Sequence, residues 1–132
     1  MVERQEPIVF RLRSDVDEEE LQRLFEAAWG KRKTDFRPVL ERSFTWVTAH
    51  AGGTLVGFVN VAWDGGVHFF LLDTTVHPDW QRQGIGTRLV RDALDACRGA
   101  GEWIHVDFDP QLASFYHHAG FEPATAAIAR VP

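Results

Sequence analysis

Residues 76–87 connect an apolar run to an amphipathic segment and read Val76-His77-Pro78-Asp79-Trp80-Gln81-Arg82-Gln83-Gly84-Ile85-Gly86-Thr87. Glycines at positions 84 and 86 remove side chains where the chain turns into the predicted helix. Several backbone N–H groups can then point at one anion, and the helix dipole adds about half a positive charge. The loop therefore predicts a cradle for a pyrophosphate group. The competing interpretation is a plain strand-to-helix turn in which glycine relieves strain.

Two familiar nucleotide-binding loops do not fit this stretch. The P-loop pattern G-x-x-x-x-G-K-[ST] is absent from the sequence, and with it the P-loop lysine. The third glycine of the G-x-G-x-x-G pattern is also missing, because Leu89 stands in its place. Predicted antiparallel hairpins precede the loop, whereas a dinucleotide-binding fold begins with a βαβ unit.

Hydrophobic periodicity predicts an α/β domain around this loop. Asp17 and Glu20 predict a capping box at the start of the first helix, which Gly30 ends. The run 67–76 consists almost entirely of apolar and β-branched residues, which predicts a central strand covered on both faces. The last predicted strand lies at an edge of the sheet, where a second copy in a homodimer could cover it. The predicted strands are 8–12, 44–50, 54–63, 67–76, 103–108 and 126–131, and the predicted helices are 17–30, 84–98 and 112–119, with a short one in the loop 31–42.

Length and composition place these elements in one domain. A chain of 132 residues, 45% hydrophobic and 25% charged, predicts a single globular domain over residues 1–132. Fourteen Lys and Arg against nineteen Asp and Glu give a net charge of −5, without the basic footprint of a nucleic-acid binder. Cys97, the single cysteine, lies on the apolar side of its helix as an inert core residue, and no Cys and His spacing predicts a metal site. No signal-like or membrane-spanning run is present, so we expect a cytoplasmic protein with no membrane partner.

Two motifs at a fixed spacing resemble those of a known family. Residues 81–86 fit the Q/R-x-x-G-x-G/A signature of the GNAT superfamily of acyl-CoA-dependent N-acyltransferases, and V-x-P precedes them at 76–78. Residues 109–121 resemble the N-x-x-A-x-x-x-Y-x-x-x-G-F segment of that family, with Tyr116 in register. The close match covers residues 71–122, and the order of elements agrees. The resemblance implies a mixed, mostly antiparallel sheet of about six to seven strands with helices on both faces.

The resemblance also implies acetyl-CoA as co-substrate and a primary amine, on a small metabolite or a peptide, as acceptor. It implies direct attack of the neutral amine on the acetyl carbonyl, without a covalent enzyme intermediate. Val76 N–H would face the thioester oxygen, where a fixed backbone donor stabilises developing charge. Tyr116 corresponds to the residue that protonates the departing thiolate, or else only packs at the cofactor wall. The implied cofactor-binding residues are Thr75, Val76, Gln81, Arg82, Gln83, Gly84, Ile85, Gly86, Thr87, Asp109 and Phe115.

The sequence departs from the family pattern at the general base. Many members carry a Glu on the strand before the loop, where Phe70 stands in this chain. Asp73 and His68 are the candidate replacements that we place beside Tyr116 in the catalytic set, with Asp107, His105 or a water-relayed base as further alternatives. Asp109 stands where the family often has Asn, so it either binds the pantetheine arm or caps a helix.

Two other functions remain open from the sequence. A non-catalytic acyl-CoA-binding or sensor module would keep the cradle and explain the missing Glu. A nucleic-acid-binding domain rests only on the basic residues 31–33 and the number of aromatic residues, so we expect no nucleic-acid partner. Among amines, the acidic net charge and the nearby Asp73, Asp107 and Asp109 favour a cationic acceptor.

Overall fold

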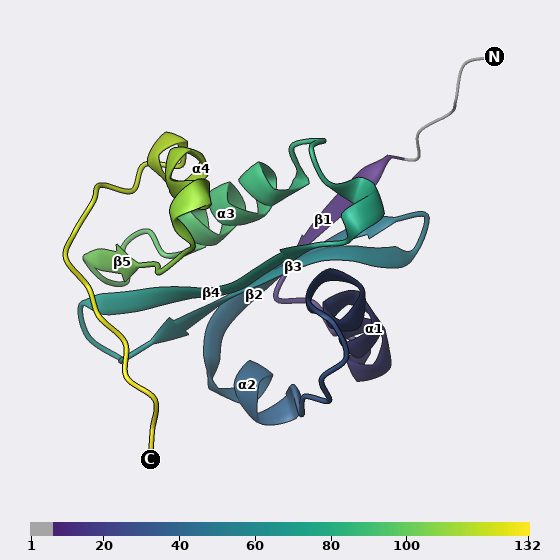
Figure 1. Ribbon diagram of the computed structural model, residues 1–132, viewed down its shortest axis with the longest axis horizontal. Coiled ribbons are helices and arrows are strands. Elements are labelled where there is room, and N and C mark those ends of the chain that lie inside the picture. Colours follow the sequence, from purple (N-terminus) through teal and green to yellow (C-terminus); the bar gives the residue numbers. More distant parts are fainter. Residues whose placement is uncertain (1–6) are drawn as a thin grey trace.

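The computed structural model describes residues 7–132 and shows a five-stranded sheet between two layers of helices (Figure 1). All neighbouring strands run antiparallel except the last two in sequence, which are parallel. The predicted mixed, mostly antiparallel sheet is therefore confirmed. In spatial order the strands are β1 (Ile8–Leu12), β2 (Ser43–Ala51), β3 (Thr54–Trp63), β4 (His68–Val76) and β5 (Trp103–His105).

Helices cover both faces of this sheet. Helices α1 (Glu18–Trp29) and α2 (Arg37–Arg42) lie on one face, and α3 (Ile85–Ala96) and α4 (Ala113–His118) lie on the other (Figure 1). The short 3-10 helices η1 (Pro78–Trp80) and η2 (Pro110–Leu112) precede α3 and α4. Within residues 7–132, no helix has both the length and the apolar character needed to cross a bilayer.

The start of α1 is only partly as predicted. Asp17 caps the helix, since its carboxylate accepts from Glu19 N–H at 2.9 Å. Glu20 does not complete the capping box. Its carboxylate accepts instead from Leu55 N–H on β3 at 3.0 Å, so it joins the helix to the sheet.

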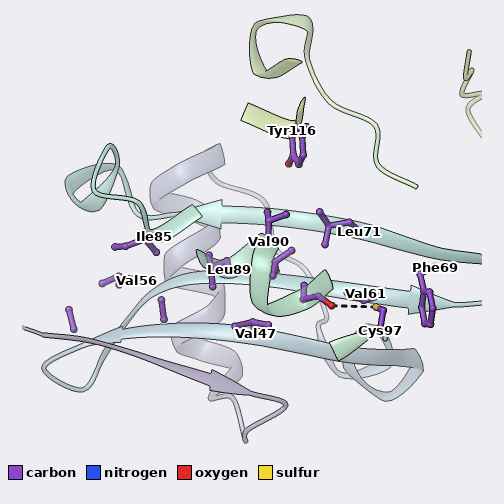
Figure 2. Close-up of a cluster of buried hydrophobic side chains, with 14 residues drawn as sticks. Val47, Val56, Val61, Phe69, Leu71, Ile85, Leu89, Val90, Cys97 and Tyr116 are labelled. Carbon is purple, nitrogen blue, oxygen red and sulfur yellow. Dashed lines mark hydrogen bonds between the residues drawn. The ribbon is translucent and has the colours of Figure 1, made fainter. Parts of the chain in front are cut away.

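Most of the core lies between α3 and the sheet (Figure 2). Cys97 belongs to it, donating its thiol to the Ala93 carbonyl at 3.3 Å, and burial raises the pKa of this thiol to about 11. A smaller cluster forms under α1 from Leu21, Leu24, Phe36, Leu55 and Phe58. The core under α3 includes Val47, Val59, Val61, Leu71, Ile85, Leu89, Val90 and Ala93.

The strand covered on both faces is β3, and the prediction that β4 has this place is wrong. Every residue from Leu55 to Val61 is buried, whereas Phe70 and Leu72 on β4 are 41% and 37% exposed. On the α1 side of the sheet, α2 packs on β2 and α1 packs on β3 and β4, where Trp29 reaches Thr75 near the end of β4. The Phe70 side of β4 therefore remains open.

The predicted number of strands is also too high. In residues 7–132 the sheet has five strands, β5 ends at His105, and residues 126–131 form no strand. Residues 124–129 are mostly alanine, which has low strand propensity, and β5 offers only three residues for pairing. The segment after α4 runs past the ends of β4 and β5 instead (Figure 1).

Candidate active site

A β-bulge near the end of β4 shapes the centre of the site. Asp73 and Thr74 together lie opposite Val59 of β3. Asp73 has a φ of 59°, a left-handed conformation that Asp tolerates better than most residues. The Thr75 hydroxyl donates to the Asp73 carbonyl at 2.9 Å and accepts from the Trp29 indole N–H at 2.9 Å. The end of α1 is thereby fixed to the bulge.

Strands β4 and β5 separate beside this bulge. They pair only over His68–Phe70 and Trp103–His105, so the outer edge of β4 is unpaired beyond that point. His77 N–H donates to the Val56 carbonyl at 2.8 Å, toward β3. Since successive N–H groups of a strand point to opposite sides, Val76 N–H points away from β3 to the open edge. A backbone donor is therefore available there.

The loop before α3 presents further free N–H groups. Arg82 and Gly84 have φ of 64° and 83°, and a Cβ built on Gly84 would meet no heavy atom within 4 Å. No side chain caps α3, and the first intrahelical bond runs from Arg88 N–H to the Gly84 carbonyl at 3.1 Å. The amides of Ile85, Gly86 and Thr87 therefore precede that bond at an uncapped helix start, as an anion-binding loop requires.

A cavity of about 460 Å³ lies over this loop, and we call it the loop cavity. Arg82 supplies the only basic side chain among the described residues that line it. A cationic side chain, an uncapped helix start and an apolar wall fit a long anionic ligand such as acyl-CoA. The lining residues are Ala28, Trp29, Thr74, Val76, Trp80, Gln81, Arg82, Gly84, Ile85, Gly86, Thr87, Leu112, Phe115 and Tyr116.

A second cavity of about 570 Å³ lies beside the first, and we call it the acidic cavity. The two share four wall residues, Trp29, Thr74, Leu112 and Tyr116. Two ligands bound in the two cavities would therefore meet at this wall. The other residues lining the acidic cavity are Leu71, Asp73, Val106, Asp107, Phe108, Asp109, Ala126, Ala127 and Ile128.

Tyr116 is buried in the shared wall. Only 5% of the residue is exposed, and its ring stacks on Phe108 with centroids 4.8 Å apart and meets Phe115 edge-on at 4.9 Å. In Figure 2 its hydroxyl end is directed toward β4. Among residues 7–132, no side chain or backbone group forms a hydrogen bond with this hydroxyl. The phenol is thus held firmly by packing while its O–H is available to a ligand.

The carboxylates of the acidic cavity are also without partners. The ion pairs found in residues 7–132 involve other acids, and no hydrogen bond reaches the carboxylates of Asp73, Asp107 or Asp109. Burial raises the pKa of Asp73 above its ordinary value, although solvent in the cavity still reaches this side chain. Asp73 is therefore a stronger base than an ordinary carboxylate.

The structure brings together most of the residues predicted for the site. Tyr116 and Asp73 line the acidic cavity, and Tyr116 also lines the loop cavity with Val76, Phe115 and most of the loop. Asp109 lies in the acidic cavity, not in the loop cavity for which the family pattern implies it. Gln81 lines the loop cavity while its side-chain amide donates to the Val76 carbonyl at 3.1 Å. Thr75 and Gln83 line neither of the two cavities.

His68 is not brought to this centre. It precedes Asp73 by five residues, a distance of about 16 Å along a strand. Its Nδ1 lies 2.7 Å from Nε2 of His105, and Phe70 stacks on His105 with centroids 4.9 Å apart. His68 lines neither of the two cavities, and His105 lies beside it. Within residues 7–132 no group of three or more His, Cys, Asp and Glu side chains is placed to hold a metal ion.

Trp29, Thr74 and Leu112 line both cavities, and sequence reasoning missed all three. Helical spacing puts Trp29 on the apolar face of α1, but 66% of it is exposed. Trp29 is the last residue of α1, directly before Gly30, so no further turn covers its ring. The position of Trp29 directly before the helix-ending Gly30 was the sequence signal that could have predicted its exposure.

Comparisons with known proteins agree with this architecture. Residues 10–121 match the model of the acetyltransferase (GNAT) family. A GNAT family acetyltransferase from Streptococcus pneumoniae superposes with a TM-score of 0.83 at 26% identity, over 95% of this chain and 98% of that one. An aminoglycoside N-acetyltransferase solved with CoA has a TM-score of 0.72 over 100% of this chain and 99% of that one, but at 18% identity it supports the fold alone.

Relatives by sequence cover a smaller part of the chain. N-alpha-acetyltransferase RimI of Mycobacterium tuberculosis is 36% identical over 81 residues, which are 58% of this chain and 51% of that protein. The chain spans about half the length of the curated relatives it matches. The family match, in contrast, includes both motifs and all five strands except the first residues of β1. The chain therefore belongs to the acetyltransferase (GNAT) family.

Proposed function

We propose that the protein transfers the acetyl group of acetyl-CoA to a primary amine by direct attack. The observation that carries this proposal is the wall shared by the two cavities, which contains the packed ring of Tyr116 with a hydroxyl that has no hydrogen-bond partner among the described residues. A co-substrate in the loop cavity and an amine in the acidic cavity would meet at that phenol. Holding two reactants side by side removes much of the entropic barrier to their reaction.

The loop cavity supplies binding and charge stabilisation. The amides at the start of α3, with the Arg82 guanidinium, hold the pyrophosphate. Bound acetyl-CoA supplies an activated acetyl thioester. Val76 N–H, on the open edge of β4, donates to the carbonyl oxygen as that oxygen gains negative charge.

Two side chains in the acidic cavity handle the protons. Asp73 accepts a proton from the amine, directly or through a water, so that the nitrogen lone pair is free to attack the carbonyl. Tyr116 donates its phenolic proton to the sulfur as the carbon–sulfur bond breaks. After the amide has formed, Asp73 is protonated and Tyr116 is a phenolate. Asp73 then releases its proton to solvent, and Tyr116 takes one up from solvent.

A non-catalytic acyl-CoA-binding module is the second candidate. Phe70 favours it, because its ring stacks on His105 outside both cavities where many relatives of this family carry a Glu base. Such a module would bind acetyl-CoA and release no thiol with any amine.

The Tyr116→Phe substitution tests the proposal. Release of the CoA thiol should require both acetyl-CoA and an amine, and the variant should lower kcat by about 10²–10⁴-fold, because it loses only the acid. Calorimetry should give the same acetyl-CoA affinity for both proteins. Trp63→Phe, on an aromatic residue outside both cavities, is the control. Unchanged kcat in Tyr116→Phe would overturn the acid role, and tight acetyl-CoA binding without turnover would favour the non-catalytic module.

A further inference from the structure

The acidic cavity carries more negative charge than one reacting amine needs. Asp73, Asp107 and Asp109 line it, and none of the described lining residues is Lys, Arg or His. Each ion pair found in residues 7–132 involves other carboxylates, namely Glu18, Asp79, Asp92 and Asp95. The three cavity carboxylates therefore lack a neutralising partner from the described chain.

The reaction needs only one of the three carboxylates to accept a proton. The attacking nitrogen must be neutral, so Asp73 can take its proton and become neutral itself. Asp107 and Asp109 then still face the bound acceptor without a counter-charge. All three residues are exposed to solvent, and their combined negative charge at one cavity attracts a cation.

The walls of the cavity are also suited to cations. Trp29 and Phe108 line it beside Tyr116, and the face of an aromatic ring attracts a positive charge. The Tyr116 ring is buried, whereas its hydroxyl is accessible and has no hydrogen-bond partner among the described residues, so it is available to a ligand in the cavity. This hydroxyl marks the reacting end of the cavity, since it is also in the wall of the loop cavity.

We infer that the acceptor is a primary amine that carries a second positive charge, held by Asp107 and Asp109 while the first nitrogen reacts beside Tyr116 and Asp73. This inference rests on the proposed function and adds the substrate class. A neutral tail would leave the two carboxylates unpaired, and an anionic tail would be repelled.

Three acceptors of equal length test it: 1,4-diaminobutane, 4-aminobutan-1-ol and 4-aminobutanoate. Their tails are cationic, neutral and anionic, and the reacting amine is the same. We expect kcat/KM for the diamine to exceed that for the amino alcohol by about tenfold, as one partly desolvated ion pair would give, and the amino acid to react most slowly.

Substitutions then locate the preference. Asp107→Asn and Asp109→Asn should each reduce the ratio of kcat/KM for the diamine to that for the amino alcohol. Asp95→Asn is the matched control, because Asp95 pairs with Arg98 at 3.0 Å on the surface of α3 and should leave the ratio unchanged. Transfer to all three acceptors at equal kcat/KM, or a ratio unaffected by both cavity substitutions, would overturn the inference alone. Transfer to none of them with acetyl-CoA bound would overturn the proposed function, and the inference with it.

Discussion

Asp73 combines a left-handed backbone with partial desolvation of its carboxylate. Its backbone is left-handed, its side chain has no hydrogen-bond or ion-pair partner among residues 7–132, and burial raises its pKa. The Trp29 and Thr75 hydrogen bonds fix the bulge that imposes this geometry. Unfavourable features that the rest of the fold maintains are typical of functional sites. Asp73 is therefore the best-supported general base among the candidates that the sequence offered.

Asp73→Asn should make the protein more stable and less active. Asn also tolerates the left-handed conformation, so the substitution removes only the charge. Since the folded-state pKa exceeds the ordinary 3.8, ionised Asp73 costs stability at pH 7. We expect the variant to raise the free energy of unfolding there, with a gain that shrinks as pH falls through the raised pKa and vanishes below 3.8. Initial rates should fall by about 10²–10⁴-fold, the range for a general base.

Asp64→Asn is the control for this sign, measured by urea unfolding at the same pH values. The Asp64 carboxylate accepts from Gly66 N–H at 2.7 Å and His68 N–H at 3.4 Å, and the first of these bonds does most to hold its pKa below the ordinary value. Its ionised form therefore stabilises the fold above the unfolded-state pKa, and Asp64→Asn should lower stability at pH 7. A shift of the same sign in both variants would contradict the account of Asp73.

At the scale of elements, the sequence predicted the loop and helix that follow β4 but not the bulge within β4. The loop 81–87, the α3 helix and Tyr116 were predictable because glycine spacing, helical periodicity and two motifs are local signals. The bulge at Asp73 was not, because strand parity assumes an unbroken alternation of faces. One extra residue in β4 changes which side chains reach the acidic cavity. No local sequence pattern predicts this bulge.

The sequence did not identify β3 as the strand covered on both faces, for a different reason. The segments 54–63 and 67–76 are both rich in apolar and β-branched side chains, so composition alone does not show which strand is more buried. Which strand is covered on both faces depends on where α1 and α3 cross the sheet. That crossing is a tertiary property. The same reasoning applies to residues 126–131, whose strand pattern has no neighbouring strand to pair with.

The contact between α3 and β3 also yields a prediction about stability. A Cβ on Gly57 would lie 3.0 Å from Leu89 Cδ1 and 3.2 Å from Ile85 Cγ2, both on α3. Gly57→Val should therefore lower the free energy of unfolding by about 1–3 kcal/mol, as overpacking does. Thr54→Val, at an exposed position of the same strand, should change it by less than about 0.5 kcal/mol. Equal stability of both variants in urea would show that α3 moves freely away from the sheet.

For the molecule as a whole, the two proposed substrates have opposite charges. The chain has a net charge of −5, and the acidic cavity adds unpaired carboxylates at the acceptor side. Acetyl-CoA is anionic, and it is received by the helix start and by Arg82. The molecule therefore attracts a cationic amine from a distance, whereas it recognises its co-substrate only at short range.

Ionic strength should consequently act differently on the two Michaelis constants. Salt shortens the range of the protein's field from about 30 Å at 0.01 M to about 8 Å at 0.15 M. We expect KM for 1,4-diaminobutane to rise several-fold over that interval, because the long-range attraction is screened, while KM for acetyl-CoA stays constant or falls. Repeating the titration with 4-aminobutan-1-ol separates the effect of the second charge, since its KM should rise less. If the KM of acetyl-CoA rose in parallel with that of the diamine, salt would be weakening both sites alike, and the acidic field would not be what selects the acceptor.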